Sequence, residues 1–236
     1  MPATLYLIPV NLSDAPLSQV LPDYNTQILL TLRHFIVENV RTARRFLRRC
    51  SREVDIDSLT FSELNVDTDP ALVAAMLEPM ERGESIGVMS EAGCPGVADP
   101  GALAVAEAQR RGYRVVPLVG PSSILMGLMA SGFNGQGFAF HGYLPIDAAE
   151  RTRTIKAMEA DSARTGMTHI FIETPYRNDK MLESLASTLR PNTLVCVASA
   201  ITDPERESIL TRPAREWKHP GRSYHKIPTI FLISAK

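Results

Sequence analysis

Two segments rich in glycine and proline follow apolar runs of the sequence and contain residue types that can bind a ligand through backbone atoms. The first, SEAGCPGVADPG at residues 90–101, contains Gly93, Gly96 and Gly101 and precedes a helical pattern that opens after Asp99. Glycines allow backbone N–H groups to approach a ligand closely or to adopt positive φ, and a helix N-terminus favours an anion. Such connections usually span about 2–6 residues. The length therefore points to either a ligand-binding loop or an extended surface turn.

The second segment, VVPLVGPSS at residues 115–123, has the same design. A strand-like run ends at a Gly-Pro break, and Ser122 and Ser123 open an apolar helical pattern, where one of them can serve as a cap. Two loops that leave neighbouring parallel strands face the same crevice at the carboxyl ends of those strands. Neither G-x-G-x-x-G after the first strand nor G-x-x-x-x-G-K-[ST] occurs, so the usual nucleotide-binding loops are not indicated.

Charged side chains suggest where an acceptor could bind and where a proton could be removed. Seven arginines and a single acid, Glu38, lie between residues 33 and 52. At helical spacing most of these arginines share one broad face, which is either solvated or suited to phosphates or another anion. Glu173 ends a strand before Thr174-Pro175 and is either a capping carboxylate or an acid of the cleft. The seven arginines are Arg33, Arg41, Arg44, Arg45, Arg48, Arg49 and Arg52.

Alternating apolar runs and helical patterns supply the elements that position these residues. Strand-like runs at 4–10, 34–39, 85–89 and 113–119 alternate with helical patterns at 23–32, 40–50, 70–82 and 100–111, which predicts a parallel α/β sheet. A second series has strands at 138–144, 168–173, 193–199, 207–211 and 228–234 and helices at 148–160 and 176–189. After residue 190 strands follow one another, which indicates antiparallel pairing. We therefore predict two domains, residues 1–118 and 119–236.

Six blocks of this sequence, in order, resemble motifs of the tetrapyrrole methylase superfamily, in its ribosomal RNA small-subunit methyltransferase I branch. SEAGCPGVADPG resembles S-D-A-G-T-P-x-x-S-D-P-G, YLIPVNL resembles T-P-I-G-N-L, and ENVRTARRFL resembles E-D-T-R-H-T-R-R-L-L. VVPLVGPSS, FAFHGYLP and FIETPYR resemble V-x-P-x-P-G-P-S-A, F-x-F-x-G-F-L-P and F-Y-E-S-P-H-R. The blocks cover nearly the whole chain.

The resemblance implies an S-adenosylmethionine-dependent methyltransferase with two α/β domains, the second α+β-like, and the methyl donor in the cleft between them. A homodimer is also implied. The implied catalytic candidates are Glu38 and Glu173. The implied acceptor-binding residues are Arg41, Arg44, Arg45 and Arg177. The implied donor-binding residues are Pro9, Glu91, Ala92, Gly93, Cys94, Val97, Asp99, Ser122 and Ser123. No metal is expected.

Departures from the family pattern concern the acceptor more than the donor. Val10-Asn11 replaces Gly-Asn, and Ser199-Ala200-Ile201-Thr202 replaces R-E-L-T, so both of those charges are missing. Three hypotheses about the function therefore stay open. They are 2′-O-methylation of ribosomal RNA, methylation of a tetrapyrrole or another anionic small molecule, and donor binding without catalysis.

Composition is consistent with an ordinary globular protein of 236 residues, with 44% hydrophobic and 22% charged residues and a net charge of −1. The near-neutral charge gives no global attraction to nucleic acid or membranes. Three widely spaced cysteines form no disulfide or zinc pattern. The N-terminus lacks the features of a signal peptide, and no apolar run approaches the ~20 residues needed to span a bilayer. We expect a cytoplasmic protein.

Overall fold

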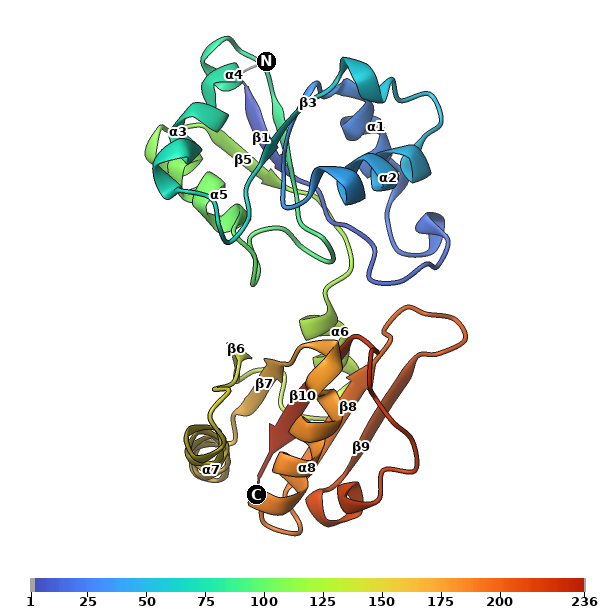
Figure 1. The fold of residues 1–236 in the computed structure, drawn as a ribbon, viewed down its shortest axis with the longest axis vertical. Helices are drawn as coiled ribbons and strands as arrows, with labels where there is room; N and C mark the ends of the chain where they lie inside the picture. The colour runs from blue at the N-terminus through green and yellow to red at the C-terminus, as the bar shows by residue number, and fades with distance from the viewer. Residues whose placement is uncertain (1–2, 236) are drawn as a thin grey trace. The chain divides into compact units, whose positions relative to one another are not determined.

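The computed structural model describes residues 3–235, which form two compact units, one ending at Ser122 and the other beginning at Ser123 (Figure 1). The sequence-based boundary lies four residues earlier, after residue 118. Residues 119–122 belong to the first unit because tertiary contacts attach them to it. The Asn25 side-chain amide donates to the Val119 carbonyl at 2.8 Å, and the Cys94 thiol donates to the Pro121 carbonyl at 3.4 Å.

The first unit contains a five-stranded sheet in which every neighbouring pair is parallel. Its strand order is β3-β2-β4-β1-β5, so β4 and β5 flank β1. All four residues of β4 are buried, as expected for an inner parallel strand covered on both faces. The strands are β1 (Thr4–Leu7), β2 (His34–Val37), β3 (Thr60–Glu63), β4 (Ile86–Met89) and β5 (Arg114–Pro117).

Helices cover both faces of this sheet, each over its own apolar core (Figure 1). One core packs α1 (Asp23–Thr31) and α2 (Val40–Cys50) against residues such as Phe35 and Val37. The other packs α3 (Val73–Met76), α4 (Glu78–Glu81) and α5 (Gly101–Arg110) against residues such as Leu5 and Ile86. Short 3-10 helices occupy Leu17–Gln19 (η1), Ile56–Ser58 (η2) and Pro70–Leu72 (η3).

The first unit departs from the sequence-based elements in two places. Strand β3 was not predicted, because its TFSE sequence is polar and the strand lies at the sheet edge, where none of its residues is buried. The helix predicted over 70–82 is broken into η3, α3 and α4. Leu77 lies between the last two, and Pro79 sits at the start of α4, because proline lacks an N–H donor and disfavours a helix interior.

The second unit contains a mixed sheet with the order β6-β7-β10-β8-β9. The β6–β7 pair is parallel, whereas the β7–β10, β10–β8 and β8–β9 pairs are antiparallel. The strands are β6 (Phe138–Tyr143), β7 (Thr168–Ile172), β8 (Leu194–Ser199), β9 (Ser208–Pro213) and β10 (Thr229–Ser234). The antiparallel end of the chain expected from the consecutive strands after residue 190 is present.

One face of this sheet packs on α7 (Ala148–Thr165), α8 (Asn178–Thr188) and the 3-10 helix η5 (Ala214–Lys218), around the buried side chains of Phe171, Trp217 and Phe231. Helix α6 (Ser123–Ser131) contacts β8, β9 and β10, and η4 (Pro175–Arg177) precedes α8. Helix α7 runs five residues beyond its predicted end at 160 and stops where Gly166 adopts a left-handed conformation with φ of 74°.

The structure confirms the predicted fold class, an α/β unit with a parallel sheet followed by a unit with a mixed sheet. Within residues 3–235, no helix combines the length and apolar character required to cross a membrane.

Candidate functional site

Three loops of the first unit, which follow β1, β4 and β5, are joined to one another at the carboxyl end of the sheet. Val10 and Gly93 exchange two backbone hydrogen bonds of 2.9 Å, which join the first loop to the second. The thiol of Cys94 donates to the Pro121 carbonyl, which joins the second loop to the third. A Cβ atom placed on Gly120 would lie 2.2 Å from Cβ of Pro9, so the third loop packs tightly on the first. The three loops therefore form one preorganised structure.

Two residues predicted to bind the donor directly have their polar groups engaged within these loops. Gly93 has a φ of +75°, and its N–H and carbonyl both pair with Val10. The Asp99 carboxylate accepts from the backbone N–H groups of Gly96 at 2.8 Å and Gly101 at 2.7 Å. Asp99 thus occupies the start of α5, where the sequence suggested a ligand anion. Burial raises the pKa of Asp99, and these N–H groups partly offset the rise.

The exposed surface of the second loop comes from Glu91, Ala92, Val97 and Ala98. Pro9 is buried between loops, and Cys94 is half-buried. Burial and the neighbouring Asp99 carboxylate raise the pKa of Cys94, which disfavours a thiolate nucleophile. At the end of the third loop, Ser122 and Ser123 are half-buried, and Ser123 begins α6.

Glu38, at the carboxyl end of β2, lies beside the second loop. Its Oε2 accepts from the Glu91 backbone N–H at 3.1 Å, and Glu91 Oε1 accepts from the Thr42 hydroxyl at 2.6 Å. Burial raises the pKa of Glu38, the Glu91 N–H lowers it, and the Glu91 and Asp99 carboxylates raise it further. Among the described residues, no lysine or arginine forms an ion pair with Glu38, Glu91 or Asp99. This group of carboxylates suits a cationic ligand.

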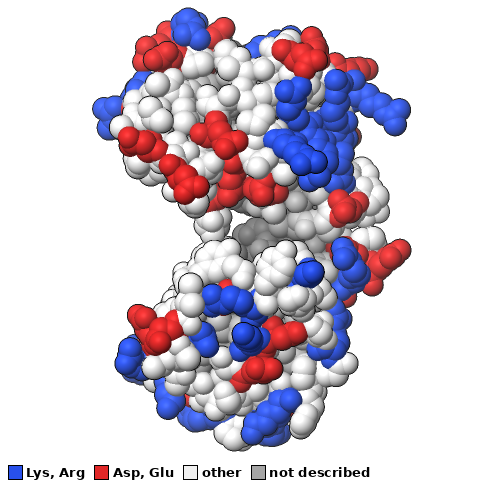
Figure 2. All heavy atoms as spheres, in the orientation of Figure 1, with Lys and Arg blue, Asp and Glu red and all other residues white. Residues whose placement is uncertain are grey.

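The arginines of α2 gather in one basic patch on the first unit (Figure 2), but they are not equivalent. Asn39 caps the helix by accepting from the N–H groups of Arg41 and Thr42. Arg44 pairs with Asp57 at 2.7 Å, although the sequence near α2 contains few acids.

Two further arginines of the helix are also engaged. Arg48 donates to the carbonyls of Arg52 and Val54, and Arg49 donates to the Ala15 carbonyl. Within residues 3–235, the guanidinium groups of Arg41 and Arg45 make no hydrogen bond or ion pair, and both side chains are exposed. These two are therefore the arginines of α2 that are available to an anion.

In the second unit, the structure brings Glu173 and Arg177 together as an ion pair. Arg177 Nη2 donates to Glu173 Oε2 at 2.7 Å, and the Thr174 N–H donates to Glu173 Oε1 at 2.7 Å. The Glu173 side chain is 3% exposed, and each of its two oxygens accepts one of these hydrogen bonds. Glu173 is therefore buried and bonded to Thr174 and Arg177.

The segment that replaces the R-E-L-T motif folds back on itself between β8 and β9. Ala200 and Thr202 have positive φ values of 49° and 71°. The Ala200 N–H donates to the Pro228 carbonyl, and Glu207 accepts from the Thr202 N–H at 2.7 Å. Asp203 and Arg206 form a hydrogen-bonded ion pair in the same turn.

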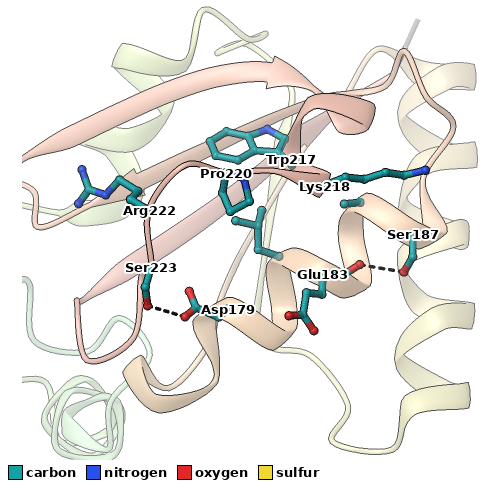
Figure 3. Close-up of a pocket in the computed structure, with 10 residues that line it drawn as sticks. Asp179, Glu183, Ser187, Trp217, Lys218, Pro220, Arg222 and Ser223 are labelled. Atoms are coloured by element: carbon teal, nitrogen blue, oxygen red, sulfur yellow. Dashed lines mark hydrogen bonds between the residues drawn. The ribbon is translucent and has the colours of Figure 1, made fainter.

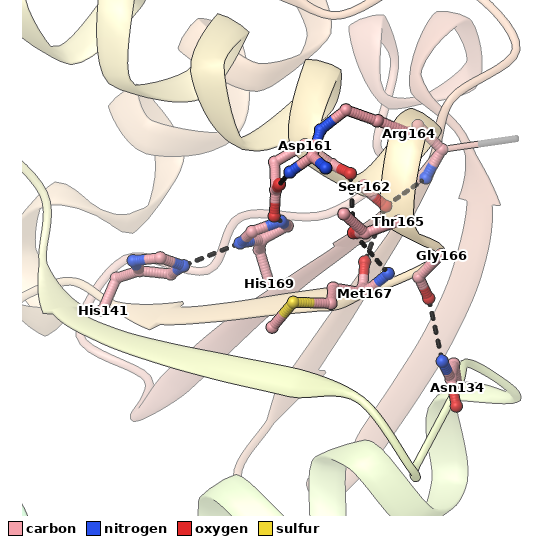
Figure 4. Close-up of polar contacts among 10 residues, drawn as sticks. Asn134, His141, Asp161, Ser162, Arg164, Thr165, Gly166, Met167 and His169 are labelled. Carbon is pink, nitrogen blue, oxygen red and sulfur yellow. Dashed lines mark hydrogen bonds and ion pairs between the residues drawn. The ribbon is translucent and has the colours of Figure 1, made fainter.

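His141 belongs to a chain of polar contacts that the sequence did not reveal (Figure 4). Its Nε2 lies 2.8 Å from Nδ1 of the buried His169, whose Nε2 lies 3.2 Å from an Asp161 oxygen. Burial lowers the pKa of both histidines, and the Asp161 carboxylate opposes this shift. His141 is thus a partnered polar residue. Among the described residues no group of three or more His, Cys, Asp or Glu side chains could hold a metal ion.

A cavity of about 570 Å³ lies between α8 and the segment that follows β9 (Figure 3). Its floor includes the buried Trp217, and Lys218 and Arg222 lie at its rim. Asp179 is engaged there by the Ser223 hydroxyl at 2.5 Å and the Tyr224 N–H at 2.7 Å. No lining residue belongs to the three loops of the first unit, and none is among the candidate site residues named from the sequence.

Three residues near the expected sites were not found from the sequence. Thr42 lies within the ENVRTARRFL block but carries no charge, so nothing distinguished it before its bond to Glu91 was seen. Tyr176 lies within FIETPYR and is 67% exposed, and Lys226 reaches its ring from a segment 50 residues away in the sequence. An aromatic residue directly before Arg177 was the available signal.

Comparisons with known proteins agree with this arrangement. No protein-family model matches the chain. The fold is similar to that of the methyltransferase CobJ, at 18% identity with a TM-score of 0.62 over 98% of this chain and 93% of that one. It is also similar to uroporphyrin-III C-methyltransferase from Thermus thermophilus complexed with S-adenosylhomocysteine, at 14% identity and a TM-score of 0.58 over 98% of this chain and 97% of that one. At these identities the similarity shows the fold, which is that of the tetrapyrrole methylases, a class of S-adenosylmethionine-dependent methyltransferases.

Within this class, the chain belongs to the family of ribosomal RNA small subunit methyltransferase I. It is 31% identical to the protein of that name from Xylella fastidiosa over 205 residues, which cover 85% of this chain and 69% of the relative. The relative from Vibrio cholerae is 30% identical over 84% of this chain and 65% of its own length. The relative from Mesorhizobium japonicum is 38% identical over 52% and 39%. The chain thus spans between about two fifths and about two thirds of these relatives.

Proposed function

We propose that this protein transfers a methyl group from S-adenosylmethionine to an RNA 2′-hydroxyl, with ribosomal RNA as the acceptor. The observation that carries the proposal is the joining of the β1, β4 and β5 loops beside three carboxylates that no basic side chain neutralises among the described residues. S-adenosylmethionine supplies an activated sulfonium leaving group. A site that binds it needs preorganised backbone and negative charge, and this part of the first unit offers both.

The structure supports dividing the nine donor-site residues by role. Glu91, Ala92 and Val97 are exposed on the second loop and would contact the donor, with the Glu91 carboxylate facing its cationic groups. Pro9, Gly93 and Asp99 shape the loops, because their contacts lie within the loops themselves. Cys94, Ser122 and Ser123 are half-buried and would line the site.

Glu38 is the better candidate for the base that accepts the hydroxyl proton. One of its oxygens is held by the Glu91 N–H, and Oε1 has no hydrogen-bond partner among residues 3–235. Its raised pKa makes it a stronger base than an ordinary glutamate. Glu173 lacks an available oxygen because Thr174 and Arg177 occupy both. We therefore assign Glu38 as the base and Glu173 as the residue that positions Arg177.

Arg41 and Arg45 would bind the acceptor through phosphate groups. They lie four residues apart on α2, so they share one face of the helix, and both guanidinium groups are available. Arg44, which the sequence also suggested, is engaged by Asp57. The name of the curated relatives, which specifies ribosomal RNA, supports an RNA acceptor.

Calorimetry and a methyl-transfer assay test this proposal together. We expect S-adenosylmethionine or S-adenosylhomocysteine to bind one site per chain, and labelled donor to modify RNA but not tetrapyrroles or other anionic metabolites. Methylation of such a metabolite instead would replace the RNA acceptor. Donor binding without transfer to any acceptor would indicate a binding protein, and absence of donor binding by folded protein would refute the proposal.

A matched pair of variants at Gly93 separates donor binding from folding. Gly93→Val should weaken donor binding because a β-branched residue strains the φ of +75° that holds the loop. Gly93→Asn should retain more affinity because asparagine tolerates left-handed backbone. Equal affinity of both variants and the parent would show that this loop does not shape the donor site.

We further propose that the protein is a cytoplasmic homodimer. Light scattering coupled to size-exclusion chromatography would measure the mass in solution, and cell fractionation would locate the protein.

A further inference from the structure

Tyr176, in η4, presents an aromatic ring at the surface of the second unit. The residue is 67% exposed and follows β7, whereas Phe171, Trp217, Tyr224 and Phe231 of this unit are buried. The ring of His225 meets it edge-on, with centroids 5.8 Å apart and an interplanar angle of 74°. Lys226 Nζ lies over the Tyr176 ring, 5.8 Å from its centroid. An exposed ring therefore lies directly beside positive charge.

Backbone contacts hold these residues in place. Lys226 has a φ of 62°, which is uncommon for a residue other than glycine, and its N–H donates to the Pro175 carbonyl at 2.8 Å. The buried Asn178 donates to the carbonyls of Tyr224 and Ile227 and so fixes both ends of the segment that carries Lys226. Backbone held in such a conformation by its surroundings is often found at functional sites.

A second cation directly follows the tyrosine in the sequence. Arg177 directly follows Tyr176, and its guanidinium is held by the buried Glu173 at 2.7 Å while 30% of the side chain stays exposed. The ring is thus flanked by Arg177 in sequence and by Lys226 in space. We refer to Tyr176, Arg177, His225 and Lys226 as the tyrosine platform.

We propose that the tyrosine platform stacks an unpaired base of the RNA acceptor on the Tyr176 ring, with Lys226 contacting the adjacent phosphate. This inference rests on the proposed RNA acceptor. Helix α2 can contact phosphates but cannot stack a base, because its aromatic residue, Phe46, is 5% exposed. Single-stranded RNA is typically bound by an exposed aromatic ring beside cationic side chains, since every base has a face that can stack.

The test compares two fluorescent single-stranded RNAs of equal length, one complete and one with abasic sites, on the 236-residue chain. The variants are Tyr176→Leu, Tyr176→Phe and Lys226→Gly. Glycine is chosen for Lys226 because it accepts the φ of 62° while it removes the charge. Thermal unfolding of each variant verifies that it is folded.

We expect Tyr176→Leu to weaken binding of the complete RNA by about fivefold or more, the size expected for loss of one stacked base. Its affinity for the abasic RNA and its salt dependence should be unchanged, and Tyr176→Phe should bind both RNAs as the parent does. Lys226→Gly should instead lower the slope of log affinity against log salt by about 0.7, the value for one single-strand phosphate contact.

The platform is refuted if folded Tyr176→Leu binds complete RNA as tightly as the parent, or loses equal affinity for both RNAs. Either result leaves the RNA acceptor intact as long as the parent binds RNA. If the parent binds neither RNA but binds a tetrapyrrole such as uroporphyrin, the RNA acceptor and the platform both fall. Absence of binding to all three probes refutes them as well.

Discussion

Removal of Arg41 and Arg45 together should reduce RNA affinity in a way that depends steeply on salt. Both guanidinium groups lack partners among the described residues, so each is free to contact a phosphate. Each contact with a single strand contributes about 0.7 to the slope of log affinity against log salt. The double variant Arg41→Ala/Arg45→Ala should therefore lower that slope by roughly 1.4.

The corresponding change in affinity is large enough to measure. Between 50 and 200 mM salt, a slope of 0.7 corresponds to about a 2.6-fold loss of affinity, and a slope of 1.4 to about a sevenfold loss. The parent should therefore lose about sevenfold more affinity over this range than the double variant does. Fluorescence anisotropy of a labelled single-stranded RNA over a salt series measures both slopes, and calorimetry should show donor binding nearly unchanged.

A second double variant, Arg44→Ala/Arg48→Ala, provides the matched control. It removes the same charge from α2 but takes away side chains already engaged by Asp57 and by the Val54 carbonyl. Its slope should stay close to that of the parent, while loss of the Arg48 hydrogen bonds lowers stability by about 1 kcal/mol. Equal slopes of log affinity against log salt for the two double variants would refute the reasoning. The arginines of α2 would then attract RNA through their total charge and not through individual phosphate contacts. An unchanged slope in the first variant would show that α2 does not contact the acceptor.

Three other perturbations follow from the structure. Gly120→Ala should destabilise the first unit by roughly 1–3 kcal/mol in denaturant titrations, because the added Cβ would lie 2.2 Å from Cβ of Pro9. The same variant should weaken donor binding. Unchanged stability would show that the loops are not tightly packed. Glu38→Gln should lower kcat without a loss of thermal stability at neutral pH. The raised pKa of Glu38 means that the folded protein favours the protonated carboxyl, so the stability this group contributes is present at low pH and is lost as pH rises, and the neutral glutamine loses nothing at pH 7. Unchanged kcat would exclude Glu38 as the base. The lowered pKa of His169 favours the neutral ring in the folded state, so the protein should become less stable as pH falls below about 6.5, the ordinary histidine value. His169→Gln should flatten this dependence of the free energy of unfolding on pH. Equal pH profiles of urea unfolding for the variant and the parent would contradict this prediction.

The sequence by itself determined the fold class, most elements and the loops of the candidate site. Periodicity and turn residues are local properties, so the strands near 86–89 and 194–199 and the helices near 40–50 and 178–188 could be predicted within a few residues. The glycine-rich segment at 90–101 indicated a special loop for the same reason. Motifs in register along the chain were sufficient to suggest the family, which the relatives then showed.

The tertiary structure alone decided which of the suggested side chains remain available. Arg44 is engaged by Asp57, 13 residues away, and Gly93 pairs with Val10, 83 residues away in the sequence. Lys226 reaches Tyr176 across 50 residues. A sequence pattern records the type and spacing of residues along one element. The hydrogen-bonding partner of a guanidinium, a carboxylate or a backbone N–H depends on which distant segments the fold brings within about 3 Å, and spacing along the chain does not encode that contact.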